Sequence, residues 1–205
     1  MPSKLLLATR NKGKIEEFRR ILESIAPGEI ELLGLENFPQ AHEVDETGST
    51  FEENAVLKAR QMCEATGIPA IADDSGLCID FLNGDPGIFS ARWAGEHGND
   101  LANNAKVLES MSEVPSGERG ARFTCAAAFA LPGGEVVTRT ADFEGEILFS
   151  PEGERGFGYD PIFKPAGYSV SSAQLSAQEK DQISHRGKAL RAIAPDVIEA
   201  LKSLG

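Results

Sequence analysis

The fold is decided by the stretch KLLLATRNKGKIEEFRRILESI at residues 4–25. The apolar run from Lys4 to Thr9 is typical of a buried strand, and the apolar side chains from Ile15 to Ile25 recur at helical spacing. The stretch therefore predicts a strand that turns directly into a helix.

Strands and helices continue to alternate along the chain. Two apolar segments, 122–131 and 135–143, flank the turn Pro132-Gly133-Gly134, which is a strong signal for an antiparallel hairpin. The other predicted segments are strands at 29–35, 69–76 and 77–82, a loop at 83–99, and helices at 51–67, 100–111 and 190–201. Helices interleaved with strands and one antiparallel hairpin predict an α/β fold with a sheet of mixed direction. We expect a single domain over residues 1–205.

The composition excludes several classes of protein. With 41% hydrophobic residues among 205, the chain can bury a sizeable core. The formal net charge of -12 repels polyanions, so we expect no nucleic-acid partner and no anionic membrane surface. Three widely spaced cysteines, and apolar runs too short for a signal or membrane segment, favour the cytoplasm.

The first candidate site is the segment from Thr9 to Lys14, where the strand turns into the helix. A helix N-terminus presents free backbone N–H groups and a partial positive charge, and Lys12 and Lys14 add two ammonium groups beside it. These features predict a phosphate site. The alternative is a helix start whose lysines only face water, although basic charge there opposes the helix dipole and so favours a bound anion.

The second candidate is the pair Asp73-Asp74, followed by Ser75. Consecutive residues in a strand point to opposite faces, so only one of the two carboxylates should enter a given site and the other should be structural. A carboxylate at a strand end can bind Mg²⁺ or deprotonate a water molecule, and Asp45 and Glu46 offer a second acidic source. The alternative is an ordinary turn.

The third candidate is Lys58. On a helix that starts at Phe51, Lys58 falls on one stripe with Ala55 and Met62, on the face that should be buried. Either its stem follows the apolar surface and its ammonium group reaches water, or the ammonium group faces an internal anion.

The fourth candidate combines Gly156–Asp160 with Ser184–Gly187. An aromatic ring between two glycines can lie flat against a base, while Asp160, His185 and Arg186 offer the acceptor and donors that read its edge. The alternative is a tight turn with a core phenylalanine and a solvated helix start.

Taken jointly, these motifs resemble the inosine triphosphate pyrophosphatase family, also called XTP/dITP diphosphatases. The resemblance spans nearly the whole chain and holds in order and spacing. The motifs that carry it are TRNKGK (9–14), ETGSTFEENAVLKA (46–59), PAIADDSGL (69–77), GDPGIFSARW (84–93), GFGYDPIF (156–163) and SHRGKAL (184–190).

The resemblance implies a homodimeric enzyme with an elongated mixed β-sheet flanked by helices, two lobes and a central cleft. The cleft would take dITP, ITP or XTP with Mg²⁺, and the products would be the monophosphate and pyrophosphate.

The resemblance also assigns roles to residues, motif by motif. Asp74 would be the general base and a metal ligand, and Ser75 would contact the substrate. Where many family members have two glutamates before Thr-Gly, this chain has Asp45-Glu46, so either could complete the metal site. The triphosphate would be bound by Thr9, Arg10, Asn11, Lys12, Gly13, Lys14, Lys58 and Lys180, and the base by Phe157, Gly158, Tyr159, Asp160, His185 and Arg186.

Two other interpretations stay open. One is a related pyrophosphatase that acts on pyrimidine or modified nucleotides. The other is a non-enzymatic nucleotide- or RNA-binding module, against which the acidic composition counts. A panel of nucleoside triphosphates assayed for pyrophosphate release separates all three.

Overall fold

The computed structural model describes residues 2–39, 41 and 44–204, and it confirms the strand-to-helix opening. Strand β1 ends at Leu7 and helix α1 begins at Lys12. Asn11 is the N-cap of α1, because its side chain accepts a hydrogen bond from the backbone N–H of Lys14 at 3.0 Å. The cap fixes where α1 begins, and so places Lys12 and Lys14 in its first turn.

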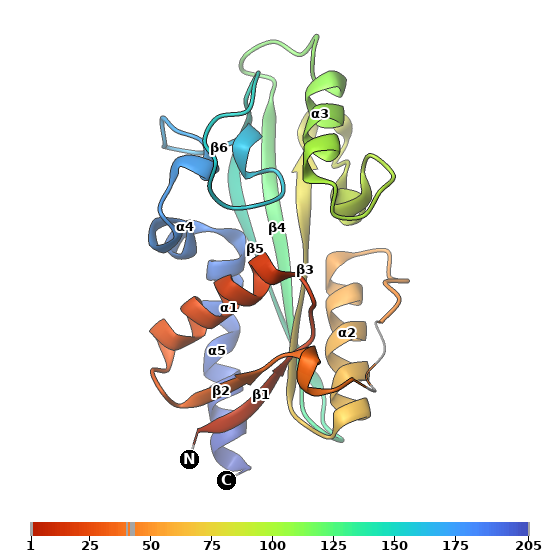
Figure 1. The fold of residues 1–205 in the computed structure, drawn as a ribbon, viewed down its shortest axis with the longest axis vertical. Coiled ribbons are helices and arrows are strands. Elements are labelled where there is room, and N and C mark those ends of the chain that lie inside the picture. Colours follow the sequence, from red (N-terminus) through yellow and green to blue (C-terminus); the bar gives the residue numbers. More distant parts are fainter. Residues whose placement is uncertain (1, 40, 42–43, 205) are drawn as a thin grey trace. The chain divides into compact units, whose positions relative to one another are not determined.

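Six strands of the described residues form one sheet, in the order β2-β1-β3-β4-β5-β6 (Figure 1). β1 pairs with β2 and with β3 in parallel, whereas β5 pairs with β6 in antiparallel orientation. The sheet is therefore of mixed direction, as the sequence predicts. The strands are β1 (Ser3–Leu7), β2 (Ile30–Leu33), β3 (Ala70–Ile79), β4 (Gly120–Ala130), β5 (Val136–Ile147) and β6 (Phe163–Pro165).

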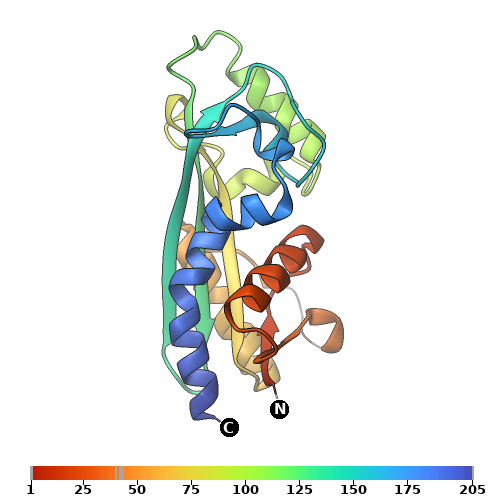
Figure 2. The ribbon, with the colours of Figure 1, turned by 90° about the vertical axis from the view of Figure 1, so that its left-hand side faces the viewer.

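Helices flank the sheet, as Figure 2 shows for α1 and α5. They are α1 (Lys12–Ile25), α2 (Phe51–Thr66), α3 (Asp100–Ser110), α4 (Ala177–Ile183) and α5 (His185–Ser203), with short 3₁₀ segments at Leu35–Asn37, Asp80–Leu82, Gly87–Arg92, Asp160–Ile162 and Ser172–Gln174. In the part of the chain that the structure describes, none of the helices is long and apolar enough to cross a membrane.

The prediction of two strands at 69–76 and 77–82 is wrong. Residues 70–79 form the single strand β3, and a 3₁₀ turn from Asp80 to Leu82 follows it. The sequence Asp73-Asp74-Ser75 resembles a turn, but in the fold both carboxylates are buried and hydrogen-bonded to basic or amide side chains from other segments. These distant partners allow the strand to continue.

Two smaller differences concern a predicted loop and a predicted strand. The predicted loop at 83–99 contains the 3₁₀ segment Gly87–Arg92, and the predicted strand at 29–35 covers only Ile30–Leu33. The hairpin is confirmed in position, because β4 and β5 are neighbours in the sheet and residues 131–135 join them.

The chain divides into two compact units, each built from separated segments. Unit 1 comprises residues 1–74, 125–141 and 186–205, and unit 2 comprises residues 75–124 and 142–185. The central cleft implied by the family resemblance stays a prediction.

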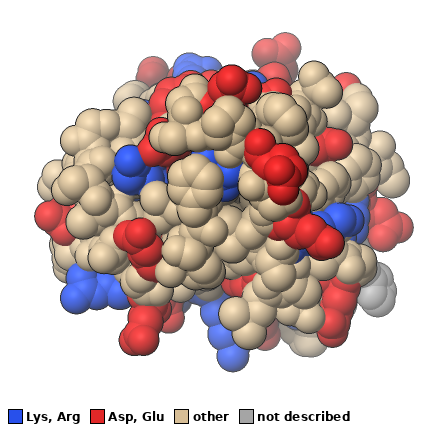
Figure 3. Space-filling view, turned by 90° about the horizontal axis from the view of Figure 1, so that it is seen from above, with Lys and Arg blue, Asp and Glu red and all other residues tan. Residues whose placement is uncertain are grey.

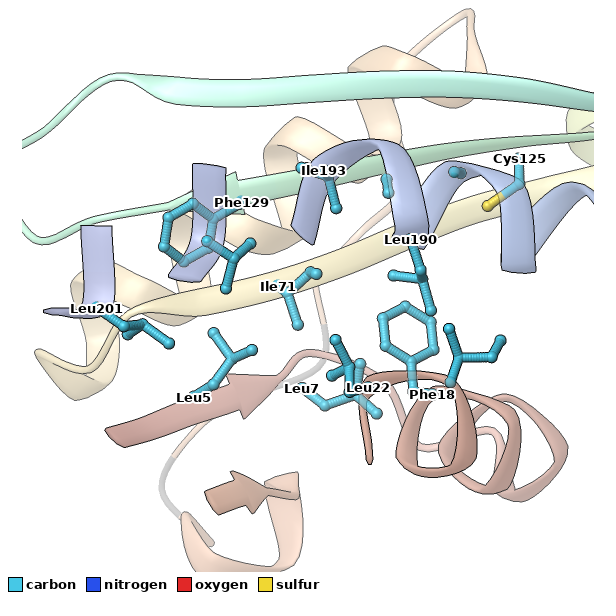
Figure 4. Close-up of a cluster of buried hydrophobic side chains, with 14 residues drawn as sticks. Leu5, Leu7, Phe18, Leu22, Ile71, Cys125, Phe129, Leu190, Ile193 and Leu201 are labelled. Carbon is cyan, nitrogen blue, oxygen red and sulfur yellow. The ribbon is translucent and has the colours of Figure 1, made fainter. Parts of the chain in front are cut away.

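Unit 1 buries side chains on both faces of its part of the sheet. Along β1, Leu5 and Leu7 pack with α1 and α5, while Leu6 packs with α2 on the other face. In β3, Ile71 lies on the α1 and α5 side and Ala72 on the α2 side. The alternation follows from the two-residue period of a strand. Figure 4 shows the first of these clusters, to which α1 contributes Phe18 and Leu22 and α5 contributes Leu190, Ile193 and Leu201.

Unit 2 has its own apolar core. Its residues come from the distal parts of β3, β4 and β5, from α3 and from the segment after Tyr159. Each fully buried leucine, isoleucine or phenylalanine contributes about 1.5–3 kcal/mol relative to an exposed one. The fully buried members are Leu77, Ile79, Val107, Met111, Ile162 and Phe163.

The three cysteines are free and buried. Cys63 and Cys125 belong to the two core clusters of unit 1, and Cys78 is buried in β3. They behave as small core residues.

Candidate active site

The first group of candidate residues lies at the carboxyl end of β1. The pairing of β1 with β3 extends as far as Leu7 and Ile71, and β3 continues into Asp73 and Asp74. The chain leaves β1 into α1 on one face of the sheet, and it reaches β3 from α2 on the other face. In open α/β sheets, ligands bind where successive connections leave on opposite faces, so this is the expected position for a site.

Lys14 and Asp73 form an ion pair in unit 1. Lys14 Nζ lies 3.0 Å from Asp73 Oδ2. The guanidinium of Arg186 also donates to Asp73 Oδ2, from Nε and Nη2 at 3.2 Å, and it donates from Nη1 to Glu17. Burial alone would raise the pKa of Asp73, but Lys14, Arg186 and Lys58 outweigh it and hold that pKa far below its ordinary value. Asp73 is therefore an internal anion that fixes two cations.

Asp74 has different partners, from α2. Asn54 Nδ2 donates to Asp74 Oδ2 at 3.1 Å, and Lys58 Nζ lies 3.2 Å from Asp74 Oδ1. Burial raises the pKa of Asp74 above its ordinary value, although Lys58 and Lys14 act in the opposite direction. Asp74 consequently binds a proton more readily than an exposed aspartate.

Lys58 lies between two carboxylates. Its Nζ is 2.7 Å from Glu46 Oε1 as well as 3.2 Å from Asp74 Oδ1. Burial alone would lower the pKa of Lys58, but Asp74 and Glu46 outweigh it and raise that pKa. The sequence left open whether this ammonium group reaches water or faces an anion, and the structure shows that it faces anions. Asp45, by contrast, is exposed.

We call these side chains the charged cluster. Its three cations face four carboxylates, so the cluster as a whole carries about one negative charge. Its members are Lys14, Lys58 and Arg186, with Glu17, Glu46, Asp73 and Asp74. Among the residues that the structure describes, no group of three or more His, Cys, Asp or Glu side chains is arranged to hold a metal ion by itself.

In the rest of the TRNKGK segment, several side chains have partners close to the start of α1. Asn11 caps α1, and its backbone N–H donates to Thr9 Oγ1 at 3.2 Å. Arg10 donates to the carbonyl of Ala41 at 3.4 Å, and Lys12 is exposed at the first position of α1. The first turn of α1 contains no acidic residue, so the helix dipole there is not neutralised from within the helix.

The second group of candidates lies in unit 2, around residues 156–160, which we call the glycine loop. Gly156 and Gly158 both have positive φ, at 76° and 62°. Asp160 Oδ2 accepts from the backbone N–H of Phe157 at 2.9 Å and from Lys180 Nζ at 2.6 Å. Lys180 Nζ lies 4.9 Å from the centre of the Phe157 ring, which is within cation–π range.

Gly156 is required by the position of Asp160. A Cβ atom at residue 156 would lie 2.1 Å from Asp160 Oδ2. At Gly158 a Cβ atom would meet nothing within 4 Å, so only the positive φ favours glycine there.

His185 is buried among aromatic rings of unit 2. Its ring stacks on Phe123 at 4.9 Å between centroids with an interplanar angle of 11°, and Phe143 lies 6.4 Å away. Tyr159 is buried as well, and its hydroxyl donates to the carbonyl of Ser90 at 2.7 Å.

The structure thus sorts the predicted residues into two groups. Lys14, Lys58 and Asp74 all belong to the charged cluster of unit 1, and their roles at the phosphate and in catalysis stay predictions. Lys180 was predicted to bind phosphate, but it pairs with Asp160 in the glycine loop. Arg186 was predicted to bind the base, but it is 2% exposed and paired with Asp73 and Glu17 in the charged cluster.

Sequence reasoning missed Glu17 and Asn54. Glu17 lies three residues after Lys14 and next to the buried Phe18, on the inward face of α1. Asn54 lies four residues before Lys58 and is 1% exposed. In both cases a polar residue occupies a buried helix stripe beside a predicted site residue, and that pattern could have identified them.

Comparison with known proteins shows which family the chain resembles over most of its length. The model of the Ham1 family matches residues 5–196. The chain is 52% identical over 199 residues to a dITP/XTP pyrophosphatase of Streptomyces coelicolor, with 97% of this chain and 99% of the relative covered.

Two solved structures are also similar. The nucleoside-triphosphatase/dITP/XTP pyrophosphatase of Mycobacterium abscessus has a TM-score of 0.75 at 47% identity, covering 95% of this chain and 99% of that one. A HAM1 protein of Coxiella burnetii has a TM-score of 0.85 at 39% identity, covering 97% and 100%. The resemblance seen in the sequence motifs is confirmed, and the chain belongs to the Ham1 family.

Proposed function

We propose that the chain hydrolyses non-canonical purine nucleoside triphosphates, dITP, ITP and XTP, to the monophosphate and pyrophosphate. The observation that carries the proposal is the charged cluster, in which Lys14 of α1 pairs with Asp73 and Lys58 of α2 pairs with Asp74, near the carboxyl end of β1. The dITP/XTP pyrophosphatases that resemble the chain over nearly its full length support the choice of substrate.

We propose Mg²⁺ as the cofactor, for a reason of charge. The charged cluster is close to neutral by itself, so its cations cannot balance a triphosphate that carries about four negative charges. The chain as a whole is acidic, with a formal net charge of -12, and on the one face that Figure 3 shows Lys and Arg lie among Asp and Glu. A divalent cation would supply the missing charge and stabilise the phosphate oxygens as the anhydride breaks.

The proposed metal ligands are Glu46 and Asp74. Both carboxylates contact the same ammonium group, Lys58 Nζ, so a cation already lies between them. One or two carboxylates completed by water and phosphate oxygens are the usual surroundings of Mg²⁺. Since Asp45 is exposed and Glu46 is paired with Lys58, we assign the site to Glu46. Glu46→Gln should weaken the apparent Mg²⁺ affinity in the assay, and Asp45→Asn should not.

In the proposed reaction, Asp74 accepts a proton from the water molecule that attacks the α phosphorus. The bond between the α phosphorus and the bridging oxygen breaks, and that oxygen leaves with pyrophosphate. In the metal-free protein burial raises the pKa of Asp74, which favours its acceptance of a proton from water. Lys14 and Lys58 are close enough to Asp74 to stabilise negative charge that develops beside it.

We propose that the glycine loop, Lys180 and His185 recognise the base. The Phe157 ring offers a stacking surface, and the ammonium group of Lys180 beside it can donate to the 6-keto oxygen of hypoxanthine or xanthine. Adenine carries a 6-amino group there, which cannot accept this hydrogen bond. A buried donor left without its acceptor can lower kcat/KM by several powers of ten. This proposal moves Lys180 from the phosphate to the base.

The homodimer and the cytoplasmic location also stay proposals. The dimer is supported by the family resemblance. The free cysteines fit a reducing compartment.

A panel of nucleoside triphosphates, assayed for pyrophosphate release with and without Mg²⁺, tests the function. We expect dITP, ITP and XTP to be turned over far faster than dATP, dCTP and dUTP, and chelation of Mg²⁺ to abolish turnover. A preference for pyrimidine nucleotides would overturn the choice of substrate. Binding without any turnover across the panel would overturn the assignment as an enzyme.

A further inference from the structure

Two side chains of α3 hold one residue of the glycine loop, Gly158, by both of its backbone polar groups. Asp100 Oδ2 accepts from the backbone N–H of Gly158 at 2.7 Å, and Asn104 Nδ2 donates to the backbone carbonyl of the same residue at 3.0 Å. Asp100 and Asn104 are four residues apart on α3, so they lie on the same face of the helix. Together they fix Gly158 on both sides.

These contacts complete the restraint on Phe157. Its own backbone N–H is held by Asp160 Oδ2 at 2.9 Å. Without side-chain contacts, glycines on both sides of Phe157 would give the loop high backbone freedom. The backbone on both sides of the Phe157 side chain is therefore restrained, by Asp160 within the loop and by Asp100 and Asn104 of α3 outside it.

Asn104 is well suited to this task. It is 6% exposed, and it belongs to unit 2 together with the loop that it holds. A hydrogen bond shielded from water is costly to lose, because the carbonyl of Gly158 would then be left without its buried donor.

We propose that Asp100 and Asn104 are positioning residues, which orient Phe157 for recognition of the purine base. The proposal rests on the proposed function, since it takes Phe157 as the surface on which the base stacks. It adds two residues from a helix that contains none of the residues assigned above, and it explains why both polar groups of Gly158 are bound by side chains of α3.

Asn103 offers a matched control. It precedes Asn104 on α3, is 2% exposed and also uses its amide on backbone groups. Its partners are the N–H of Ala94 and the carbonyl of Ala91, not the glycine loop. Asn103→Asp and Asn104→Asp make the same change of charge and volume, and each removes one donor to a backbone carbonyl.

The experiment compares steady-state kinetics on dITP with inhibition by inorganic pyrophosphate, which has no base. We expect Asn104→Asp and Asp100→Ala to raise KM for dITP about tenfold while kcat and the inhibition constant of pyrophosphate change little. Asp100→Asn retains an acceptor oxygen for the Gly158 N–H, so it should restore KM. Asn103→Asp should leave KM unchanged whatever its effect on stability.

A structural role alone would give a different result. If Asn104→Asp and Asp100→Ala lower thermal stability but leave KM at the level of Asn103→Asp, the positioning role is wrong. Asp100 is partly exposed, so Asp100→Ala remains informative even if Asn104→Asp does not fold.

Phe157→Ala distinguishes failure of the proposed base site from failure of the positioning role of Asp100 and Asn104. If Phe157→Ala raises KM for dITP and the α3 variants do not, the positioning role fails and the base site stands. If Phe157→Ala itself leaves KM unchanged, the proposed base site fails.

Discussion

Asp73 and Asp74 are neighbours in β3 whose carboxylates point to opposite faces of the sheet, one towards Lys14 and the other towards Lys58. Their surroundings move their pKa values in opposite directions, down for Asp73 and up for Asp74. Two carboxylates with pKa values driven apart are a common arrangement where one is permanently charged and the other exchanges protons. This difference leads to separate predictions for the two residues.

Asp74→Asn should lower kcat for dITP by about a hundredfold or more, the usual scale for losing a positioned base. The amide keeps the size of the side chain, and burial already opposes charge at this position, so thermal stability should be unchanged or higher. Steady-state pyrophosphate release and a thermal unfolding curve measure both effects. Turnover near that of the wild type would remove Asp74 from the mechanism.

Asp73→Asn should instead destabilise the fold, by about 3–5 kcal/mol near neutral pH. The substitution leaves Lys14 and Arg186 without the carboxylate that they share. Because the folded-state pKa of Asp73 lies below its ordinary value of 3.8, its stabilisation is complete above that pH and is lost as the pH falls further. Urea unfolding of both proteins at several pH values should therefore show a constant difference above about pH 5 and a shrinking one below 3.8. A difference that grows in acid would contradict this account.

Lys58→Met should make the protein more dependent on Mg²⁺. Without the ammonium group, Glu46 and Asp74 face each other with no cation between them, so the metal-free variant should unfold at a lower temperature. Added Mg²⁺ should raise that temperature more in the variant than in the wild type, because the ion can occupy the place of the ammonium group.

Lys202→Met is the control for this prediction. Lys202 is also a lysine of unit 1 paired with a glutamate, Glu29 at 3.1 Å, but the pair is at the surface. Its response to Mg²⁺ should equal that of the wild type. An equal response in Lys58→Met would argue against a metal between Glu46 and Asp74.

Gly156→Ala should weaken binding of the base more than Gly158→Ala does. Both substitutions place a side chain at positive φ, which costs about 1–2 kcal/mol. Only at residue 156 does the new Cβ atom collide with Asp160, which must then release Phe157 or Lys180. KM for dITP and thermal stability of the two variants, measured side by side, test the difference. Equal KM values would show that the position of Asp160 does not matter for the substrate.

Much of unit 1 could be predicted from local patterns. The opening strand and helix, and the buried stripe of α2 that contains Lys58, follow from spacing of apolar residues. The continuous strand β3 could not be predicted, because a run of two aspartates is stable inside a sheet only with partners that come from residues 14, 54, 58 and 186. A pattern of neighbouring residues contains no information about partners so distant in the sequence.

The roles of Lys180 and Arg186 show the same limit. The family resemblance assigns Lys180 to the phosphate and Arg186 to the base, but their neighbours in the structure are Asp160 for Lys180 and Asp73 for Arg186. Arg186 follows His185 directly in the chain, yet the two residues belong to different compact units. Proximity in the sequence therefore does not predict which of the two compact units His185 or Arg186 joins.

The division of the chain into separated segments also has a consequence for synthesis in the cell. The core of unit 1 contains Leu5 and Leu7 from the start of the chain and Leu190, Ile193 and Val197 from α5. A ribosome delivers α5 long after β1, so the apolar side chains of β1 stay without their α5 partners until α5 has been synthesised. Nascent chains truncated before α5 should therefore bind chaperones, and unit 1 should become compact only once α5 has left the ribosome.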